Sequence, residues 1–252
     1  DHFNLRYPAE PQRLGGDADE NSLRGWSLEE QVRAIKQNID VASRWGASEY
    51  LLFSKKDVFE YLLDYDFTVE GQHLAEAAGW DPDPRYQAAL RDLIAYAHER
   101  DIALIFHTNE FHIDGEIEAV VGEVEAGSEI LWDITEKKLQ EFFELYPAID
   151  GLQLTGDETT YNIENTAQAI RLGRLASRAA GPERKVILRL WDRIGALGTP
   201  TQENIEDMAE GRDNVWLSFK NTAGDFGWVT EQPFNDEMVG EGDPERQYVE
   251  FD

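Results

Sequence analysis

The segment Gly151–Glu158, with the sequence GLQLTGDE, ends a short apolar run with two adjacent carboxylates, Asp157 and Glu158. Two later carboxylates, Asp225 and Glu250, likewise lie at or just after the ends of apolar runs. General acid–base chemistry needs one protonated carboxylic acid that gives a proton and an ionised partner that takes one. Placed on opposite sides of a sugar ring, such groups could hydrolyse a glycosidic bond.

The other apolar runs end in groups that could bind a sugar. His107 and Asn109 follow one run, and Arg189 and Lys220 lie at the ends of two others. Asp157 could orient its neighbour or hydrogen-bond a hydroxyl. The indole rings of Trp191 and Trp228 offer faces on which a sugar could stack.

Each of these residues also has a purely structural interpretation. Asp157 or Glu158 could cap the helix that we expect to begin near Ile163. Arg189 lies within an apolar run and could be an ion-pair partner of Glu158. Asp225 follows a glycine and could be only a turn residue.

A metal site is the weaker alternative. His107, His112 and Asp114 could ligate a divalent ion, but their spacing matches no helical His-x-x-x-His pattern. The chain has no cysteine, which excludes thiolate ligands and nucleophiles. We therefore expect no metal and no cofactor.

Short strands alternating with amphipathic helices must position these groups. The predicted strands are 2–7, 49–53, 102–107, 151–155, 185–191, 214–219 and 247–251. The predicted helices are 27–45, 84–100, 135–146, 163–180 and 202–210. Two long connections, 55–84 and 108–133, exceed ordinary strand-to-helix loops, and we expect them to shape a substrate cleft.

This alternation predicts a parallel α/β sheet, either an open doubly wound sheet or a barrel. No Gly-x-Gly-x-x-Gly follows an early strand, and polar clusters follow strand after strand. Both features favour a (β/α)8 TIM-type barrel that forms one catalytic domain over residues 1–252. Because the last predicted strand lies at the end of the chain, we expect the barrel to lack its last elements here.

The net charge of −28, from 51 acidic and 23 basic residues, makes nucleic acid and anionic membranes poor partners. The acidic residues are spread along the chain, which is typical of a halophilic surface whose mutual repulsion is screened by salt. No run reaches 18 apolar residues. We expect a soluble protein, cytoplasmic or secreted, that works in a high-salt environment.

Several segments resemble family 67 of the glycoside hydrolases, the xylan α-glucuronidases. WLSFKNTAGDFGWVTEQPFND followed by QYVEFD resembles the Lys-Asn-x-x-x-Asp-Phe … Pro-Phe … Glu-Phe-Gln series of that family. Upstream, IDGLQLTGDET resembles its strand ending in the general acid, and VILRLWDRIG resembles its next strand, which carries an arginine. The order and approximate spacing match over residues 100–252.

The resemblance implies an inverting hydrolase on a (β/α)8 barrel that releases an α-linked uronic acid from an oligo- or polysaccharide. Glu158 would be the general acid, Asp225 and Glu250 would activate water, and Arg189 and Lys220 would hold a uronic carboxylate. The chain departs from the family at Leu154, where the family has a further lysine. The rival hypotheses are a non-catalytic carbohydrate-binding barrel and a metal-dependent isomerase or lyase.

Overall fold

The computed structural model describes residues 13–14, 27–54, 56–109, 113–122, 124, 127–155, 165–190, 213–220 and 246–250. Its helices are α1 Leu28–Arg44, α2 Lys56–Tyr61, α3 Leu74–Ala78, α4 Pro84–His98, α5 Gly115–Val121, α6 Glu129–Leu145 and α7 Thr166–Ala180. Its strands are β1 Arg13–Leu14, β2 Glu49–Ser54, β3 Thr68–Val69, β4 Gln72–His73, β5 Ala103–Asn109, β6 Gly151–Thr155, β7 Lys185–Leu190, β8 Val215–Lys220 and β9 Gln247–Glu250.

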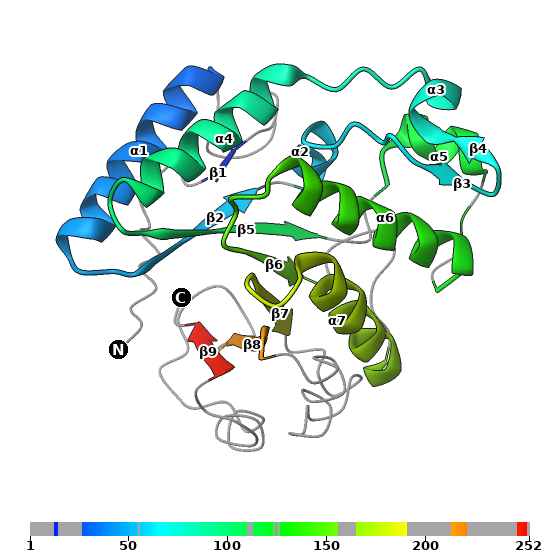
Figure 1. Ribbon diagram of the computed structural model, residues 1–252. Helices are drawn as coiled ribbons and strands as arrows, with labels where there is room; N and C mark the ends of the chain where they lie inside the picture. The colour runs from blue at the N-terminus through cyan, green and yellow to red at the C-terminus, as the bar shows by residue number, and fades with distance from the viewer. Residues whose placement is uncertain are drawn as a thin grey trace.

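Seven of these strands form one parallel sheet in the order β1-β2-β5-β6-β7-β8-β9. Successive strands along the chain are neighbours in the sheet, and the described connecting helices α1, α4, α6 and α7 lie on the same side of it (Figure 1). The predicted α/β class with a parallel sheet is confirmed. The expected strand 2–7 and helix 202–210 lie outside the described residues, and the first described strand is β1.

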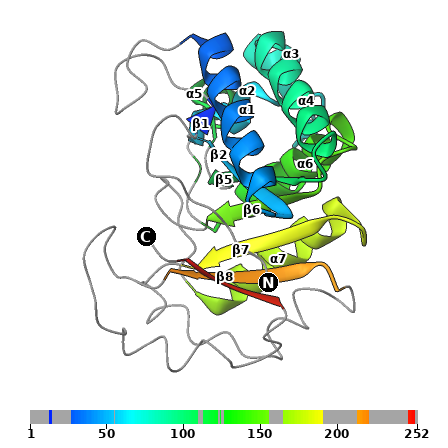
Figure 2. The same cartoon turned by 90° about the vertical axis from the view of Figure 1, so that its left-hand side faces the viewer.

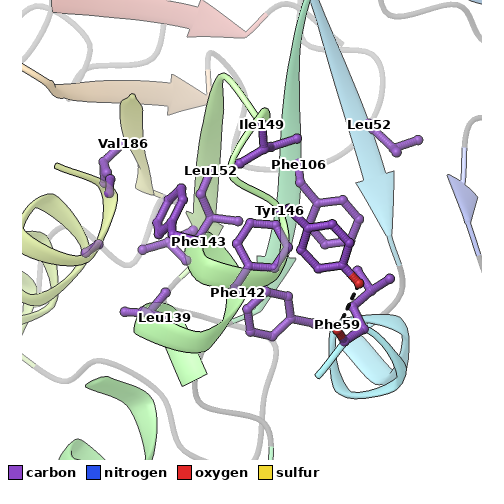
Figure 3. Close-up of a cluster of buried hydrophobic side chains, with 14 of the residues drawn as sticks. Leu52, Phe59, Phe106, Leu139, Phe142, Phe143, Tyr146, Ile149, Leu152 and Val186 are labelled. Carbon is purple, nitrogen blue, oxygen red and sulfur yellow. Dashed lines mark hydrogen bonds between the residues drawn. The ribbon is translucent and has the colours of Figure 1, made fainter. Parts of the chain in front are cut away.

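The two faces of the sheet differ in chemistry. The side chains that face the helices are apolar and at most 2% exposed: Leu52, Leu104, Phe106, Leu152, Leu154, Val186, Leu188, Val215 and Leu217. Figure 3 shows part of this layer, where Phe59 of α2, Phe106 of β5 and Phe142 of α6 pack with ring centroids 5.1–6.2 Å apart. The hydrophobic core therefore lies between the sheet and its helices.

The opposite face carries polar and charged residues among apolar ones such as Ile105 and Ile187, and contacts across it show that the sheet is curled. Lys185 of β7 pairs with Glu49 of β2, and its ammonium donates to the hydroxyl of Tyr248 of β9 at 2.6 Å. That hydroxyl donates to the Glu49 carboxylate at 2.8 Å. In a flat sheet β2 and β9 would lie five strand spacings apart, about 24 Å. These contacts therefore require that the sheet is curled, with this face on its inside. Figure 2 shows the strands of the sheet from a second direction.

Small residues make room for this internal ion pair. Gly151, in register between Ile105 and Lys185, faces the interior between β5 and β7. A Cβ atom added there would lie 2.5 Å from the carbonyl oxygen of Lys185, a distance that no side chain tolerates. Glycine at this position permits the close approach of β6 to β7.

Two long connections follow β2 and β5 and leave the sheet at its carboxyl edge. We call residues 62–83 and 113–122 the rim lobe; it contains β3, β4, α3 and α5, and α3 packs against α5 (Figure 1). Part of the predicted connection 108–133 is regular structure, which corrects the sequence prediction. Helix α6 begins at Glu129 because the Ser128 hydroxyl accepts the Leu131 N–H at 3.3 Å and caps it.

Helix α6 anchors the rim lobe through buried charges. One carboxylate oxygen of Glu141 accepts the backbone N–H of Tyr65 at 2.9 Å, and the other accepts that of Asp66 at 2.7 Å. Tyr65 has a left-handed backbone with φ 55°, which turns both N–H groups toward the acid. One turn earlier on α6, Lys138 pairs with Glu60 at 2.5 Å, and both side chains are 1% exposed.

No helix in the described part of the chain is both long and apolar enough to cross a bilayer.

Replacement of Lys185 by methionine should lower the free energy of unfolding, measured by urea denaturation, by on the order of 3 kcal/mol. The change leaves the Glu49 carboxylate, whose side chain is only 20% exposed, without its cation. The double variant Glu49→Gln/Lys185→Met should recover part of the loss. Lys36→Met, which breaks a surface pair with the half-exposed Asp92, should cost less than about 1 kcal/mol. If Lys185→Met and Lys36→Met lowered the free energy of unfolding equally, the interior ion pair would not stabilise the fold more than a surface pair does.

A pH dependence is expected from Glu141. Burial, with Asp64 and Asp66 nearby, raises the pKa of this carboxyl to about 7 in the folded protein. The protonated form is thus favoured by folding, so the stabilisation is present at low pH and is lost as pH rises through 7. Between pH 5.5 and 8.5 the wild type should lose about 2 kcal/mol more than Glu141→Gln in denaturant unfolding at constant salt.

The matched control for this charge change is Glu144→Gln, an exposed position on the same helix. Its pH profile should follow that of the wild type. A profile of Glu141→Gln that also follows the wild type would show that Glu141 does not titrate in this range.

Candidate functional site

The carboxyl edge of the curled sheet gathers several of the predicted site residues. Asn109 ends β5, Lys220 ends β8 and Glu250 ends β9, while Arg189 is the last residue but one of β7. Parallel strands end at one edge, so four separate regions of sequence meet at this rim.

The strand register places these positions on the interior face. Asn109 is in register with Thr155, Thr155 with Arg189, and Arg189 with Ser218. Lys220 follows Ser218 by two residues and is in register with Glu250. Residues in register across a parallel sheet share a face, and residues two apart along a strand share it too. Two adjacent rows on this face therefore carry an amide, two basic residues and one acid.

His107 and Arg189 are brought into one cluster by two residues that the sequence did not single out. The Nε2 atom of His107 lies 2.8 Å from the Oγ1 atom of Thr155. The imidazole stacks on the ring of Phe53, with centroids 4.4 Å apart and planes inclined by 30°. The Arg189 guanidinium carbon lies 5.9 Å from the centroid of the same Phe53 ring.

This cluster is largely removed from solvent. His107 is 5% exposed, Thr155 is 1% exposed and Arg189 is 7% exposed. A guanidinium in such surroundings is poorly hydrated, so an anion that reached it would form charge-assisted hydrogen bonds of more than usual strength. The arrangement can therefore bind a polar or anionic ligand at the rim.

Several predicted residues lie outside the described part of the chain: Asp157, Glu158, Trp191, Asp225 and Trp228. The side chains of Asn109, Lys220 and Glu250 are likewise not described, although their strand positions are. The ion-pair alternative for Arg189 with Glu158 remains a prediction for the same reason.

The helix-capping alternative for Asp157 and Glu158 is wrong for the helix that follows. Helix α7 begins at Thr166 and not at Ile163. Its N-cap is Asn165, whose side-chain oxygen accepts the backbone N–H of Gln168 at 3.0 Å. Glu158 and Asp157 lie seven and eight residues before Asn165 along the chain, so neither occupies the N-cap position of α7.

The metal alternative stays a hypothesis, because only two of its three proposed ligands are described. Asp114 caps α5, since its carboxylate accepts the Glu116 N–H at 2.8 Å, and His107 contacts Thr155. No group of three or more histidine, aspartate or glutamate side chains that could hold an ion occurs among the described residues. The third proposed ligand, His112, lies outside them.

The residues that sequence reasoning missed carried a readable signal. Gln153 and Thr155 are polar residues at alternate positions of an otherwise apolar strand, and both are at most 2% exposed. Ser218 repeats the pattern on β8. Such alternation marks the interior face of a barrel strand. Phe53 carried no such signal, because an apolar residue at a strand end is ordinary.

Comparison with known proteins gives similarity of fold. The chain matches an enzyme of glycoside hydrolase family 138 targeting the pectin rhamnogalacturonan II, with a TM-score of 0.55, 13% identity and coverage of 80% of this chain and 24% of that one. It also matches a family 20 catalytic module of the pneumococcal exo-β-D-N-acetylglucosaminidase, with a TM-score of 0.52 and 16% identity. This match covers 78% of this chain and 56% of that one.

A third match is a GH5_18 protein of Bifidobacterium longum subsp. longum, with a TM-score of 0.50, 12% identity and coverage of 77% and 46%. The chain thus spans between a quarter and somewhat more than half of the length of these proteins. No protein-family model and no curated protein sequence matches the chain. The comparisons therefore establish that the chain shares its fold with proteins of several glycoside hydrolase families.

Proposed function

We propose that the chain is a glycoside hydrolase and that residues 1–252 belong to one catalytic barrel domain. The observation that carries the proposal is that the strand positions of Arg189, Lys220 and Glu250 lie on one face of a curled parallel sheet, at its carboxyl edge. In barrels of this architecture the catalytic groups come from the carboxyl ends of different strands. The shared fold with glycoside hydrolases supports this reading.

The proposed reaction is an inverting hydrolysis of an α-linked sugar. Glu158, three residues beyond the end of β6, gives a proton to the leaving oxygen. Glu250 and Asp225 together take a proton from the attacking water on the other side of the ring. An inverting pair of carboxyl groups stands about 6.5–9.5 Å apart, which leaves room for that water.

The proposed substrate is an oligosaccharide or polysaccharide fragment whose terminal sugar carries a carboxylate. Arg189 and Lys220 lie on neighbouring strands, and Arg189 is one residue from the end of its strand. Two cations on one rim suit a uronic acid, because a carboxylate can accept hydrogen bonds from both at once. His107, Asn109 and Asp157 would bind the hydroxyls, and Trp191 and Trp228 would stack on the sugar ring.

Glu158→Gln, Asp225→Asn and Glu250→Gln should each lower kcat on the hydrolysed oligosaccharide by about 100-fold or more, because each removes a proton-transfer group. Proton NMR of the first product should show the anomer opposite to that of the substrate. Glu116→Gln, an exposed position in the rim lobe, should leave kcat unchanged. Wild-type protein that binds the oligosaccharide without cleaving it would instead identify a carbohydrate-binding barrel.

Arg189→Gln should lower kcat/KM for a 4-nitrophenyl α-glucuronide by roughly 10-fold or more, and much less for the matched α-glucoside, because only the first has a carboxylate to pair. Lys220→Gln is the second variant, in case Arg189, buried in its strand, is needed for folding. An equal decrease in kcat/KM for the two glycosides would indicate that the natural substrate carries a neutral sugar instead of a uronic acid.

A further inference from the structure

The rim lobe is attached to helix α6 by polar contacts at three positions of that helix. Near the middle of α6, the ammonium of Lys137 donates to the carbonyl oxygen of Thr68 at 2.5 Å. At its end, the hydroxyl of Tyr146 donates to the carbonyl oxygen of Leu62 at 2.9 Å. Glu141 lies between these two positions and binds the lobe through both of its carboxylate oxygens. A single helix therefore holds the first residues of the lobe.

The Glu141 carboxylate is buried against the lobe and close to negative charge. It is 9% exposed, and it accepts the backbone N–H groups of Tyr65 and Asp66 at 2.9 and 2.7 Å. Burial and the nearby carboxylates of Asp64 and Asp66 raise the pKa of Glu141 to about 7. The ionised carboxylate thus gains two N–H donors in the docked lobe, but it loses water and meets like charges.

Charged side chains of the elements next to Glu141 have partners of their own: Lys137 pairs with Asp133, Lys138 with Glu60, His73 with Asp66, and Arg91 lies over the ring of Tyr146. Burial also raises the pKa of Tyr146, so its hydroxyl stays neutral near pH 7. Glu141 is therefore a buried group at this contact whose charge changes near neutral pH.

We propose that the rim lobe is released from α6 as the pH rises, and that Glu141 controls this release. While the lobe is docked, an ionised Glu141 is poorly hydrated and lies close to Asp64 and Asp66. Once the lobe is released, water solvates the carboxylate and the like charges separate. Protonation of Glu141 therefore favours the docked lobe, and this stabilisation is lost as the pH rises through about 7.

The release is a local opening and not an unfolding of the barrel. Within the lobe, α3 packs against α5, so the lobe keeps contacts of its own when it leaves α6. Its two segments follow β2 and β5, whose carboxyl-terminal halves carry Phe53 and His107 of the candidate site (Figure 1). Docking of the lobe therefore determines the surroundings of this part of the carboxyl edge. The inference goes beyond the proposed hydrolysis and does not depend on it.

Hydrogen exchange of the full chain at pH 5.5 and 8.5 and constant salt tests the release. Protection factors correct for the intrinsic exchange rate at each pH. For the Tyr65 and Asp66 amides they should fall roughly 30-fold, because the pKa of Glu141 is about 7 in the docked lobe and returns to its ordinary value of 4.5 on release. At pH 8.5 these amides should be at least about tenfold less protected than the amides of β6. Equal protection in the lobe and in β6 would show that the lobe opens only when the whole fold unfolds, and would overturn the inference.

Two variants test the role of Glu141. Glu141→Gln removes the ionisable group, so the protection of the Tyr65 and Asp66 amides should be the same at both pH values. Asp64→Asn is the second variant, in case glutamine disturbs the two backbone hydrogen bonds. It removes one like charge and keeps an oxygen for the hydrogen bond that Gln87 donates at 2.6 Å. The pKa of Glu141 should then fall, and the loss of protection should shrink to roughly tenfold or less. A loss of protection that is undiminished in both variants would overturn the inference.

The matched controls are Glu144→Gln and His73→Asn. Glu144 is an exposed acid on the same helix. His73→Asn removes the histidine that pairs with Asp66 and keeps a residue suited to cap α3. Both variants should lose protection between pH 5.5 and 8.5 as the wild type does. A His73→Asn variant whose protection no longer depends on pH would assign the response to the histidine and overturn the role of Glu141.

Discussion

The interior contact of Lys185 with Glu49 and Tyr248 is the constraint on which the shape of the site depends. It joins β7 to β2 and β9 near the amino-terminal ends of the strands. Burial and the neighbouring Glu49 carboxylate raise the pKa of Tyr248, so its hydroxyl keeps the proton that it donates. A sheet fixed in this curvature at one end brings Phe53 near Arg189 at the other end. The position of the candidate site thus follows from a contact outside it.

The same strands have to meet two opposite demands. Their helix-facing residues, such as Leu152 and Leu188, provide the hydrophobic burial that stabilises the fold. Several of their interior residues are polar and must find partners on the inside of the curled sheet, as Lys185 does. The rim lobe is held by Glu141, and the buried Lys138–Glu60 pair joins α6 to α2 just before the lobe begins. Lys185 and Glu141 thus complete their hydrogen bonds with groups from distant parts of the chain, as most buried polar groups do.

The sequence predicted the described elements well wherever a local signal was strong. The strand Gly151–Thr155 has the predicted limits, and Pro84 begins a helix as expected. The predictions were poorer where an N-cap residue determines the first residue of a helix. Ser128 caps α6 and Asn165 caps α7, so these helices begin several residues away from their predicted starts. The role of Phe53 could not be predicted, because it arises from contacts between strands far apart in the chain. The face of the sheet on which a residue lies follows from its position along its own strand. The curvature of the sheet depends on contacts between strands that are far apart in the sequence.

A net charge of −28 is expected to repel an anionic substrate. Repulsion by the surface acids and attraction by a buried cation act over different distances. Repulsion from dispersed surface acids is screened beyond about 3 Å at molar salt. A buried cation such as Arg189, in direct contact with its ligand, is screened far less because little salt enters the space between them. A high-salt environment would therefore weaken the general repulsion while leaving the specific attraction, which makes an acidic surface compatible with the proposed uronic acid substrate.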